Sequence, residues 1–452
     1  MKDLLRKYNV PAPRYTSYPT VPYWDEEAFT AEGYLGSARR SFNETNASEG
    51  VSLYIHLPYC EKLCTFCGCN KRITLNHDVE GPYIKALLKE WEMYIGLFEG
   101  KLLIKELHLG GGTPTFFSPK SLEVLIKGLF AKSSISEGAE FGFEGHPNNT
   151  TLEHLTVLRE LGFSRVSFGV QDNDPRVQEA INRIQPGERV EEVTNWARKL
   201  GYTSVNYDLV YGLPFQKMSS IENTIEHTLG LMPDRIAFYS YAHVPWIKGL
   251  GQRKFTENDL PPEDEKRNFY ETGRGLLEGA GYIEIGMDHF SLKTDSLYKA
   301  MMGGRLHRNF MGYTSSKTQL MIGLGVSSIG DSWYGFAQNE KKVEDYMNAV
   351  NGSGFPVFRG HLLNEEDRHI RKKALDIMCF GKTILNEGEW EEIHGEIIGR
   401  LKGLENDGLV LIEGNNISVT SLGRAFLRNI CMAFDVRLWR KSPGNEMFSR
   451  AI

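Results

Sequence analysis

The stretch SLYIHLPYCEKLCTFC occupies residues 52–67. Its first half reads as a buried strand, and its second half places Cys60, Cys64 and Cys67 on one short loop. Three thiolates in C-x3-C-x2-C spacing can bind three irons of a cubane cluster and leave the fourth iron open. Soft thiolates also suit zinc, but structural zinc sites normally use four ligands in paired C-x2-C spacing. The loop therefore predicts a [4Fe–4S] cluster at the end of a strand.

Composition narrows the class of protein. The chain has 452 residues, a formal net charge of −6 and no long basic run, so we expect no nucleic-acid partner. No stretch approaches the roughly 18 apolar residues of a membrane span, and the first residues do not resemble a secretory signal. Four of the six cysteines lie within ten residues, which in an intracellular chain indicates metal ligands and a reducing compartment. We expect a cytoplasmic protein.

Strand and helix patterns alternate from about residue 50. Short apolar runs, typical of strands, are followed by amphipathic stretches, which predicts βαβ units and a parallel sheet. We expect an α/β fold, a partial (β/α)6 barrel of parallel strands, with its site where the carboxyl ends of the strands meet their loops. The predicted strands are 51–57, 104–109, 140–144, 165–170, 204–210 and 235–239, and the predicted helices are 83–98, 120–131, 152–161, 189–200 and 221–229.

Three segments are expected along the chain. Residues 1–45 are rich in Pro and Tyr and lack clear periodicity, which favours a wrapping or lid segment. Residues 46–345 form the partial barrel with an extension. Residues 346–452 contain two helical patterns, a hairpin at 408–420 and a last helix, which predicts a mostly helical, winged-helix-like domain that packs against the barrel because it lacks a dense basic face.

Further candidate residues follow the predicted strands. A triple glycine, Gly110-Gly111-Gly112, comes at the end of the second strand, where it is either a simple tight turn or a loop whose backbone approaches a ligand closely. Glu144 ends the third strand and can bind an ammonium group or a ribose, although solvated loop carboxylates are common. Gln171, Arg183 and Asp208 are placed similarly near strand or helix ends.

Motifs along nearly the whole chain extend this pattern. The chain closely resembles the oxygen-independent coproporphyrinogen III oxidases (dehydrogenases) of the radical S-adenosylmethionine (SAM) superfamily, from RYTSYPT at residues 14–20 to the last residue. The late motifs lie outside any generic cluster-binding core. The motifs are HLPYCEKLCTFCGCN (56–70), HLGGGTPT (108–115), SFGVQD (167–172), NYDLVYGLP (206–214), YAHVP (241–245), GMDHF (286–290), LHRNFMGYT (306–314), RNICMAFD (428–435) and FSRAI (448–452).

The resemblance implies a specific reaction. Two propionate side chains of coproporphyrinogen III would be oxidatively decarboxylated to vinyl groups by way of a 5′-deoxyadenosyl radical, giving protoporphyrinogen IX. It also implies a [4Fe–4S] cluster and two SAM molecules. By resemblance, Tyr54, Gly111, Glu144 and Ile329 match the first SAM site, and Phe66, Gly112, Thr113, Gln171, Arg183, Asp208 and Ala242 match the second.

Several residues keep more than one interpretation. Three interpretations of Cys69 stay open: an inert buried thiol, a transient donor near the radical, or a contact to the second cofactor. We favour a place in the active site without cluster ligation. His56 shares a strand face with Tyr54, and a core role is favoured. Cys379 and Cys431 are expected in the core. Arginine forks suit the four carboxylates of the substrate, although each candidate is by default a surface residue. The candidates are Arg14, Arg305, Arg308 and Arg428.

The chain departs from the family pattern at two positions. His146 stands where an acidic residue is expected after Glu144, and Ala433 stands where a cysteine is expected in RNICMAFD. Neither change removes a residue assigned to the cluster or to SAM, and a shifted substrate preference stays open.

Two other functions compete. Heme chaperones related to this family share the barrel but usually follow the third cysteine with an aromatic–Asp pair, where this chain has Gly68-Cys69-Asn70. A zinc-stabilised binding module would contain zinc and no iron. The favoured reaction implies coproporphyrinogen III as substrate and a reductase or flavodoxin-type electron donor, and we expect a monomer.

Overall fold

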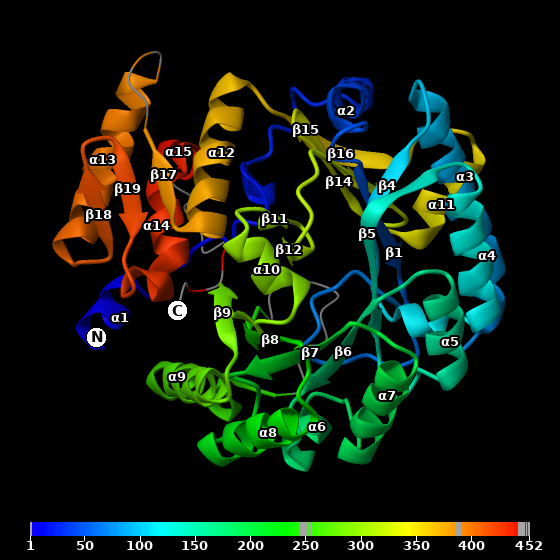
Figure 1. Ribbon diagram of the computed structural model, residues 1–452, viewed down its shortest axis with the longest axis horizontal. Helices are drawn as coiled ribbons and strands as arrows, with labels where there is room; N and C mark the ends of the chain where they lie inside the picture. Colours follow the sequence, from blue (N-terminus) through cyan, green and yellow to red (C-terminus); the bar gives the residue numbers. More distant parts are fainter. Residues whose placement is uncertain are drawn as a thin grey trace.

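The fold is built on one large mixed sheet. The computed structural model describes residues 2–244, 252, 255–385, 388, 390–441, 448 and 450. All six predicted strands are present and pair in parallel in chain order, which confirms the α/β class (Figure 1). They are β1 (Val51–Leu57), β4 (Leu103–Gly111), β5 (Ser134–Gly145), β6 (Arg165–Gln171), β7 (Ser204–Tyr211) and β8 (Arg235–Ser240).

The sheet extends beyond the six predicted strands on both sides. A seventh parallel strand, β13 (Leu320–Leu324), pairs with the outer side of β1. Its sequence LMIGL is fully buried, and this apolar run was the available signal for it. Antiparallel strands complete the sheet: β14 (Ile329–Ser332), β15 (Gly335–Asn339) and β16 (Val357–Leu362) follow β13, while β10 (His289–Ser291) and β9 (Ile283–Gly286) follow β8.

Helices cover the outer face of the parallel strands (Figure 1). Several begin at a side-chain cap, as at Ser118, whose hydroxyl accepts from the Ser121 amide, and at Thr151, whose hydroxyl accepts from the His154 amide. Their apolar faces and the strands form one core, except that Val177 of α6 belongs to a separate apolar cluster. The helices are α3 (Glu80–Leu97), α4 (Pro119–Phe130), α5 (Leu152–Glu160), α6 (Pro175–Ala180), α7 (Gly187–Lys199), α8 (Met218–Leu231) and α9 (Glu263–Gly279).

The first 45 residues include more regular structure than the sequence indicated. After α1 (Lys2–Tyr8), the chain crosses the molecule to α2 (Ala31–Thr45), which packs on β15 and β16 (Figure 1). Between these helices, Tyr15 and Tyr18 are buried in the core of the C-terminal region. The stretch before α2 therefore packs against the C-terminal region, whereas α2 packs on strands of the large sheet. The division of the chain into three segments stays a prediction.

The C-terminal region has its own hydrophobic core. The sheet continues past the domain boundary that we predicted at residue 345, because β16 pairs with β15. The predicted hairpin gains a third strand, β17, which pairs with β19. The elements after β16 are α12 (Glu365–Phe380), β17 (Lys382–Ile384), α13 (Glu391–Asn406), β18 (Val410–Glu413), β19 (Asn416–Val419), α14 (Leu427–Phe434) and α15 (Val436–Arg440).

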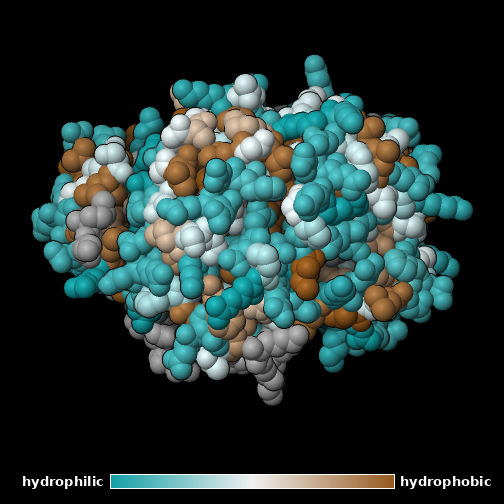
Figure 2. Space-filling view, turned by 90° about the horizontal axis from the view of Figure 1, so that it is seen from below, coloured by the Kyte–Doolittle hydropathy of each residue, from teal (hydrophilic) through white to brown (hydrophobic). Residues whose placement is uncertain are grey.

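The surface view gives no sign of an extended apolar face on the side it shows. Seen from below, the surface is mostly hydrophilic, with hydrophobic residues in separated areas (Figure 2). Within the described part of the chain, no helix combines the length and apolar character needed to cross a bilayer.

Candidate active site

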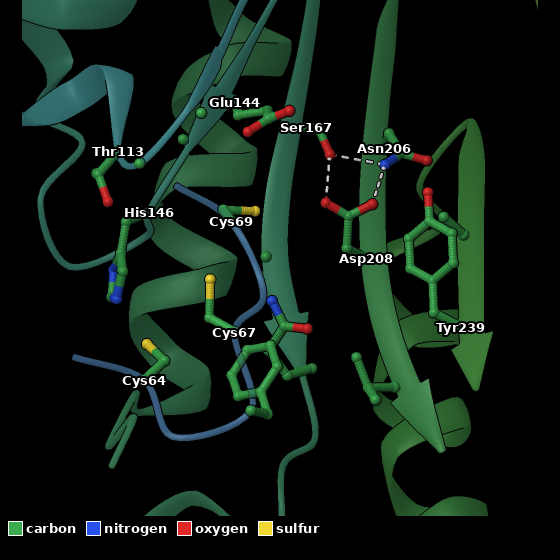
Figure 3. Close-up of a pocket in the computed structure, with 18 of the residues that line it drawn as sticks. Cys64, Cys67, Cys69, Thr113, Glu144, His146, Ser167, Asn206, Asp208 and Tyr239 are labelled. Atoms are coloured by element: carbon green, nitrogen blue, oxygen red, sulfur yellow. Dashed lines mark hydrogen bonds between the residues drawn. The ribbon is translucent and has the colours of Figure 1, made fainter. Parts of the chain in front are cut away.

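A cavity of about 760 Å³ opens at the carboxyl ends of the parallel strands. The cysteine loop lies along one side of it, and polar side chains from β6 and β7 lie along the other (Figure 3). Most of the predicted site residues line this single cavity. They are Cys60, Cys64, Phe66, Cys67, Cys69, Gly111, Gly112, Thr113, Glu144, Gln171, Arg183, Asp208 and Ala242.

The cysteine loop is fixed by bonds to its backbone. Cys60 ends the short strand β2 (Tyr59–Cys60), which pairs in parallel with β3 (Arg72–Ile73). The ammonium group of Lys71 donates to the carbonyl of Cys67 at 3.0 Å and to that of Cys69 at 3.2 Å. On the far side, the amide of Asn182 donates to the Leu63 carbonyl at 2.7 Å. These bonds hold the loop open toward the cavity.

The donor set fits a cubane cluster. Cys64, Cys67 and Cys69 extend into the cavity in Figure 3, and Cys60 also lines it. Among the described residues, no three Cys, His, Asp or Glu side chains are grouped as ligands of one metal ion. A cubane does not need such convergence, because each thiolate binds a different iron. Positive charge surrounds the thiols, with Arg183 Nη1 3.7 Å from the sulfur of Cys64.

The thiols differ in acidity before any metal binds. A hydrogen bond from Cys69, helped by Lys71, lowers the pKa of the Cys67 thiol to about 6, although burial opposes the shift. Burial raises the pKa of the Cys60 thiol to about 11, although the hydroxyl of Thr113 donates to its sulfur at 3.3 Å. Metal binding must displace a proton from Cys60, since thiolates are the ligands.

The glycine-rich loop approaches the cysteine loop at backbone distance. The Gly112 amide donates to the Leu57 carbonyl at 2.8 Å, and the Thr113 amide donates to the Tyr59 carbonyl at 3.0 Å. A Cβ atom on Gly112 would lie 2.6 Å from the backbone of Pro58. Gly111 has a φ of +113°, which disfavours other residues. The triple glycine is therefore more than a simple turn: it brings backbone against the cluster-binding segment.

Glu144 projects from β5 toward the upper part of the cavity (Figure 3). Its carboxylate lies 3.3 Å from Nε2 of His108, whose ring stacks on Tyr54. Tyr54 itself is not among the residues that line the cavity, but the His108 ring on which it stacks does line it. Ile329, also expected in the first SAM site, packs instead with Trp24 and Phe336 in a separate apolar cluster. Neither of these two predicted contacts lines the cavity.

Asp208 is held in a fixed orientation on β7. Its two carboxylate oxygens accept from the Ser167 hydroxyl at 2.9 Å and the Asn206 amide at 2.9 Å (Figure 3). Burial, and then the negative charge of Glu144, raise the pKa of Asp208 to about 6. This carboxylate is suited to accept hydrogen bonds from neutral hydroxyl groups, such as those of a ribose.

Residues that the sequence interpretation missed support the wall of the cavity. The amide of Gln252 donates to the carbonyls of Phe66 at 3.3 Å and Ala242 at 3.0 Å, joining two predicted contacts of the second SAM molecule. Ser167 and Asn206, next to Asp208, were also overlooked. The available signal for Asn206 was its position two residues before Asp208, on the same face of β7. Ser167 lies opposite Asn206 on the neighbouring strand β6.

The other residues discussed from the sequence have the following positions. His56 is buried and its Nε2 lies 2.9 Å from the Asn70 carbonyl, so it is a core residue that supports the cysteine loop. Cys379 and Cys431 are buried, as expected. His146 lines the cavity, whereas Ala433 is buried in α14. In the terminal motif at 448–452, residues 449, 451 and 452 lie outside the described residues, as does Pro245 of YAHVP.

Comparisons with known proteins agree with this geometry. Residues 54–228 match the radical SAM superfamily model. The chain is 36% identical to an oxygen-independent coproporphyrinogen III oxidase of Synechocystis, covering 100% of this chain and 97% of that protein. It is 37% identical to the protein of the same name in Escherichia coli, covering 99% and 98%. The solved structure of coproporphyrinogen III oxidase (HemN) from Escherichia coli, a radical SAM enzyme, covers 96% of this chain and 98% of its own, with a TM-score of 0.87 at 35% identity. The chain therefore belongs to the radical SAM superfamily and, within it, to the oxygen-independent coproporphyrinogen III oxidases.

Proposed function

We propose that this protein converts coproporphyrinogen III to protoporphyrinogen IX without oxygen, by oxidative decarboxylation of two propionate groups to vinyl groups. The observation that carries the proposal is one cavity that combines the Cys60–Cys64–Cys67 loop, the glycine-rich loop and oriented carboxylates, in a chain similar to these oxidases over its full length. Each conversion removes one hydrogen atom, one electron and CO2 from a propionate.

The chain's residues would hold the reactants as follows. The cluster and SAM supply, when bound, one-electron cleavage of SAM to methionine and a 5′-deoxyadenosyl radical. The thiolates of Cys60, Cys64 and Cys67 would bind three irons. The backbone of Gly111 and the carboxylate of Glu144 would take the polar end of the first SAM molecule.

A second SAM molecule is part of the proposal. Asp208 would accept hydrogen bonds from the ribose of this second SAM molecule. Its other polar groups would be bound by Gln171, at the end of β6, and by Arg183. What supports this arrangement is that all seven predicted contacts of the second molecule line the same cavity. Phe66 and Ala242 are joined there through Gln252, which would keep the wall rigid.

We also propose the cellular setting. Six free cysteines, of which four gather at the cluster loop, need a reducing compartment, which favours the cytoplasm. The electron that reduces the cluster for SAM cleavage would come from a reductase or a flavodoxin-type protein. The protein would act as a monomer.

An anaerobic turnover assay tests the function. Reconstituted protein, supplied with SAM and a one-electron reductant, should convert coproporphyrinogen III to the divinyl product, detected by mass analysis of the oxidised porphyrins. Cys64→Ala should lack the intact cluster and all turnover, whereas Cys379→Ala, a change at a buried thiol away from the cavity, should keep its iron. Cleavage of SAM with all four propionates intact would refute the proposed reaction.

A further inference from the structure

Three basic side chains gather next to the cavity, outside the cluster and SAM contacts. One of them lines the cavity, and the other two contact residues that line it. We name Arg14, Lys266 and Arg308 the basic cluster. Arg14 lines the cavity, and its Nη2 donates to the Ser240 carbonyl at 3.2 Å. Lys266 donates to the Tyr241 carbonyl at 2.6 Å. Each of these two cations therefore binds a neutral backbone oxygen at the end of β8.

Arg308 is the most unusual member of the basic cluster. It is 6% exposed, and its Nε and Nη1 atoms are buried with no hydrogen-bond partner among the described residues. Among the described residues, its Nη2 donates to the Arg14 carbonyl alone, at 3.3 Å, which is longer than most such bonds. A buried guanidinium with unpaired donors costs free energy, because the lost hydration is not replaced.

No carboxylate of the described chain neutralises the basic cluster directly. None of its three members forms an ion pair within 4 Å among the described residues, although carboxylates pair with arginines elsewhere in the fold. Asp288 is the acid that interacts with both Arg14 and Arg308 through longer-range charge. Mutual repulsion is visible at Lys266, whose pKa is lowered to about 8 by burial and then by the charge of Arg14. The cluster therefore carries excess positive charge.

The surroundings of Arg308 indicate the shape of the missing partner. Its guanidinium lies 4.6 Å from the ring centroid of Tyr313, and Tyr313, His289 and Tyr239 all line the cavity. Nε2 of His289 lies 3.3 Å from the Tyr239 hydroxyl, and burial, with the charge of Arg308, lowers the pKa of His289 to about 4. The ring is therefore neutral, so the wall next to the basic cluster is aromatic and uncharged. An aromatic body with attached carboxylates matches this combination.

We propose that Arg308, together with Arg14 and Lys266, is the subsite that binds carboxylate groups of the substrate away from the reacting propionate. This inference rests on the proposed function. A substrate carboxylate would replace the Arg14 carbonyl as the partner of Arg308 and bind its planar fork with two hydrogen bonds. The free energy cost of the unpaired guanidinium is thereby recovered only when the tetracarboxylate is bound.

The test compares binding of two probes to the anaerobically reconstituted holoenzyme. Coproporphyrin III, the oxidised tetracarboxylic analogue, and its tetramethyl ester are titrated by fluorescence quenching. Arg308→Met should raise the Kd of the tetraacid about 10- to 100-fold and leave the Kd of the ester unchanged. Arg305→Met is the matched control, because Arg305, a candidate by sequence, is exposed and does not line the cavity, and it lies three residues earlier in the chain. It should leave both Kd values unchanged.

A second readout separates substrate binding from a structural role. Replacing an unpaired buried charge by an apolar side chain of similar length should leave the unfolding temperature of the protein equal or higher. An arginine that stabilises the fold would lower it on removal. Iron content and SAM binding should also stay at the wild-type level.

The outcomes test the proposed function and the carboxylate subsite separately. If the wild type does not decarboxylate coproporphyrinogen III, the proposed function fails. If the wild type does so, and Arg308→Met binds the tetraacid as tightly as the wild type, the subsite is wrong. If Arg308→Met does not fold, Arg308→Lys decides, since it keeps the charge but lacks the fork. Weaker tetraacid binding at an equal or higher unfolding temperature supports the subsite, and unchanged binding overturns it.

Discussion

Nη1 of Arg183 lies 3.7 Å from the sulfur of Cys64, although 119 residues separate them in the chain. The same guanidinium donates from Nη2 to the Gly169 carbonyl at 2.7 Å. One side chain thus joins the end of β6 to the cysteine loop. Sequence motifs list these residues separately, and the fold makes them neighbours within one site.

This contact predicts a large effect of removing the guanidinium. Arg183→Met should lower kcat/KM for coproporphyrinogen III by roughly 100-fold, because a half-buried charged donor proposed to bind the second SAM molecule is lost. Arg183→Lys should restore only part of it, since an ammonium group cannot make both contacts at once. Iron content should be unchanged in both variants. Steady-state kinetics with iron analysis checks this, and wild-type kinetics in Arg183→Met would contradict it.

The backbone contact at Gly112 predicts a strong effect of one methyl group. Gly112→Ala should lower stability by about 1–3 kcal/mol, because its Cβ would overlap the Pro58 backbone and push the cysteine loop away. Thermal unfolding and iron content after reconstitution measure both consequences. Gly96→Ala in α3 is the control: its Cβ would meet nothing within 4 Å, so that variant should be equally or more stable. Equal behaviour of the two variants would refute the argument.

Glu90 predicts a pH dependence of stability. This buried carboxyl accepts from Tyr346 at 2.6 Å, Asn339 at 2.6 Å and the Gly325 amide at 2.8 Å. Burial raises its pKa from 4.5 to about 7, a shift worth about 3 kcal/mol. The folded state therefore holds the proton more tightly than the unfolded state, and stability from this group is present below pH 4.5 and lost as pH rises to about 7.

The comparison with Glu90→Gln isolates that dependence. The unfolding free energy of the wild type, minus that of the variant, should fall between pH 4.5 and about 7 and level off above, because Gln does not ionise. Denaturation midpoints at a series of pH values give this difference, in which other titrating groups cancel. A difference that is constant across the range would show that Glu90 ionises normally.

His146 predicts an effect on the cluster's reduction potential. Nδ1 of its ring accepts from the Asn148 amide at 3.2 Å, and burial, followed by the charges of Arg183 and Lys62, lowers its pKa to about 2. The ring is therefore neutral where the family pattern has an acid. His146→Asp should shift the potential to lower values by on the order of 60 mV, a tenfold change in a one-electron equilibrium.

A redox titration followed by electron paramagnetic resonance measures this shift. Asn148→Asp is the matched control, because it adds the same charge at an exposed position two residues further on, where water screens it. Its potential should stay close to that of the wild type. Equal shifts in the two variants would show that His146 has no special position beside the cluster.

Much of the fold followed from local patterns. Most of the six predicted strands are short apolar runs, so the sequence alone indicates that they are buried. β5 is the exception: it begins at Ser134, before the predicted 140–144, and the residues of its first half are exposed or half-buried. β13 was missed because its place in the sheet depends on its partner β1, which is far away in the chain: Ser52 pairs with Met321. The α2 helix was missed because Pro and Tyr nearby obscured its weaker pattern.

The cluster loop and the order of strands were determined by the sequence alone, because cysteine spacing and periodicity are local properties of the chain. What only the tertiary structure decided is which distant groups share one cavity. It placed Asp208 within reach of Ser167, kept Tyr54 and Ile329 out of the cavity lining, and left Nε and Nη1 of Arg308 buried with no hydrogen-bond partner among the described residues. The physical reason is that desolvation and charge pairing depend on everything packed around a group, and those neighbours come from all parts of the chain.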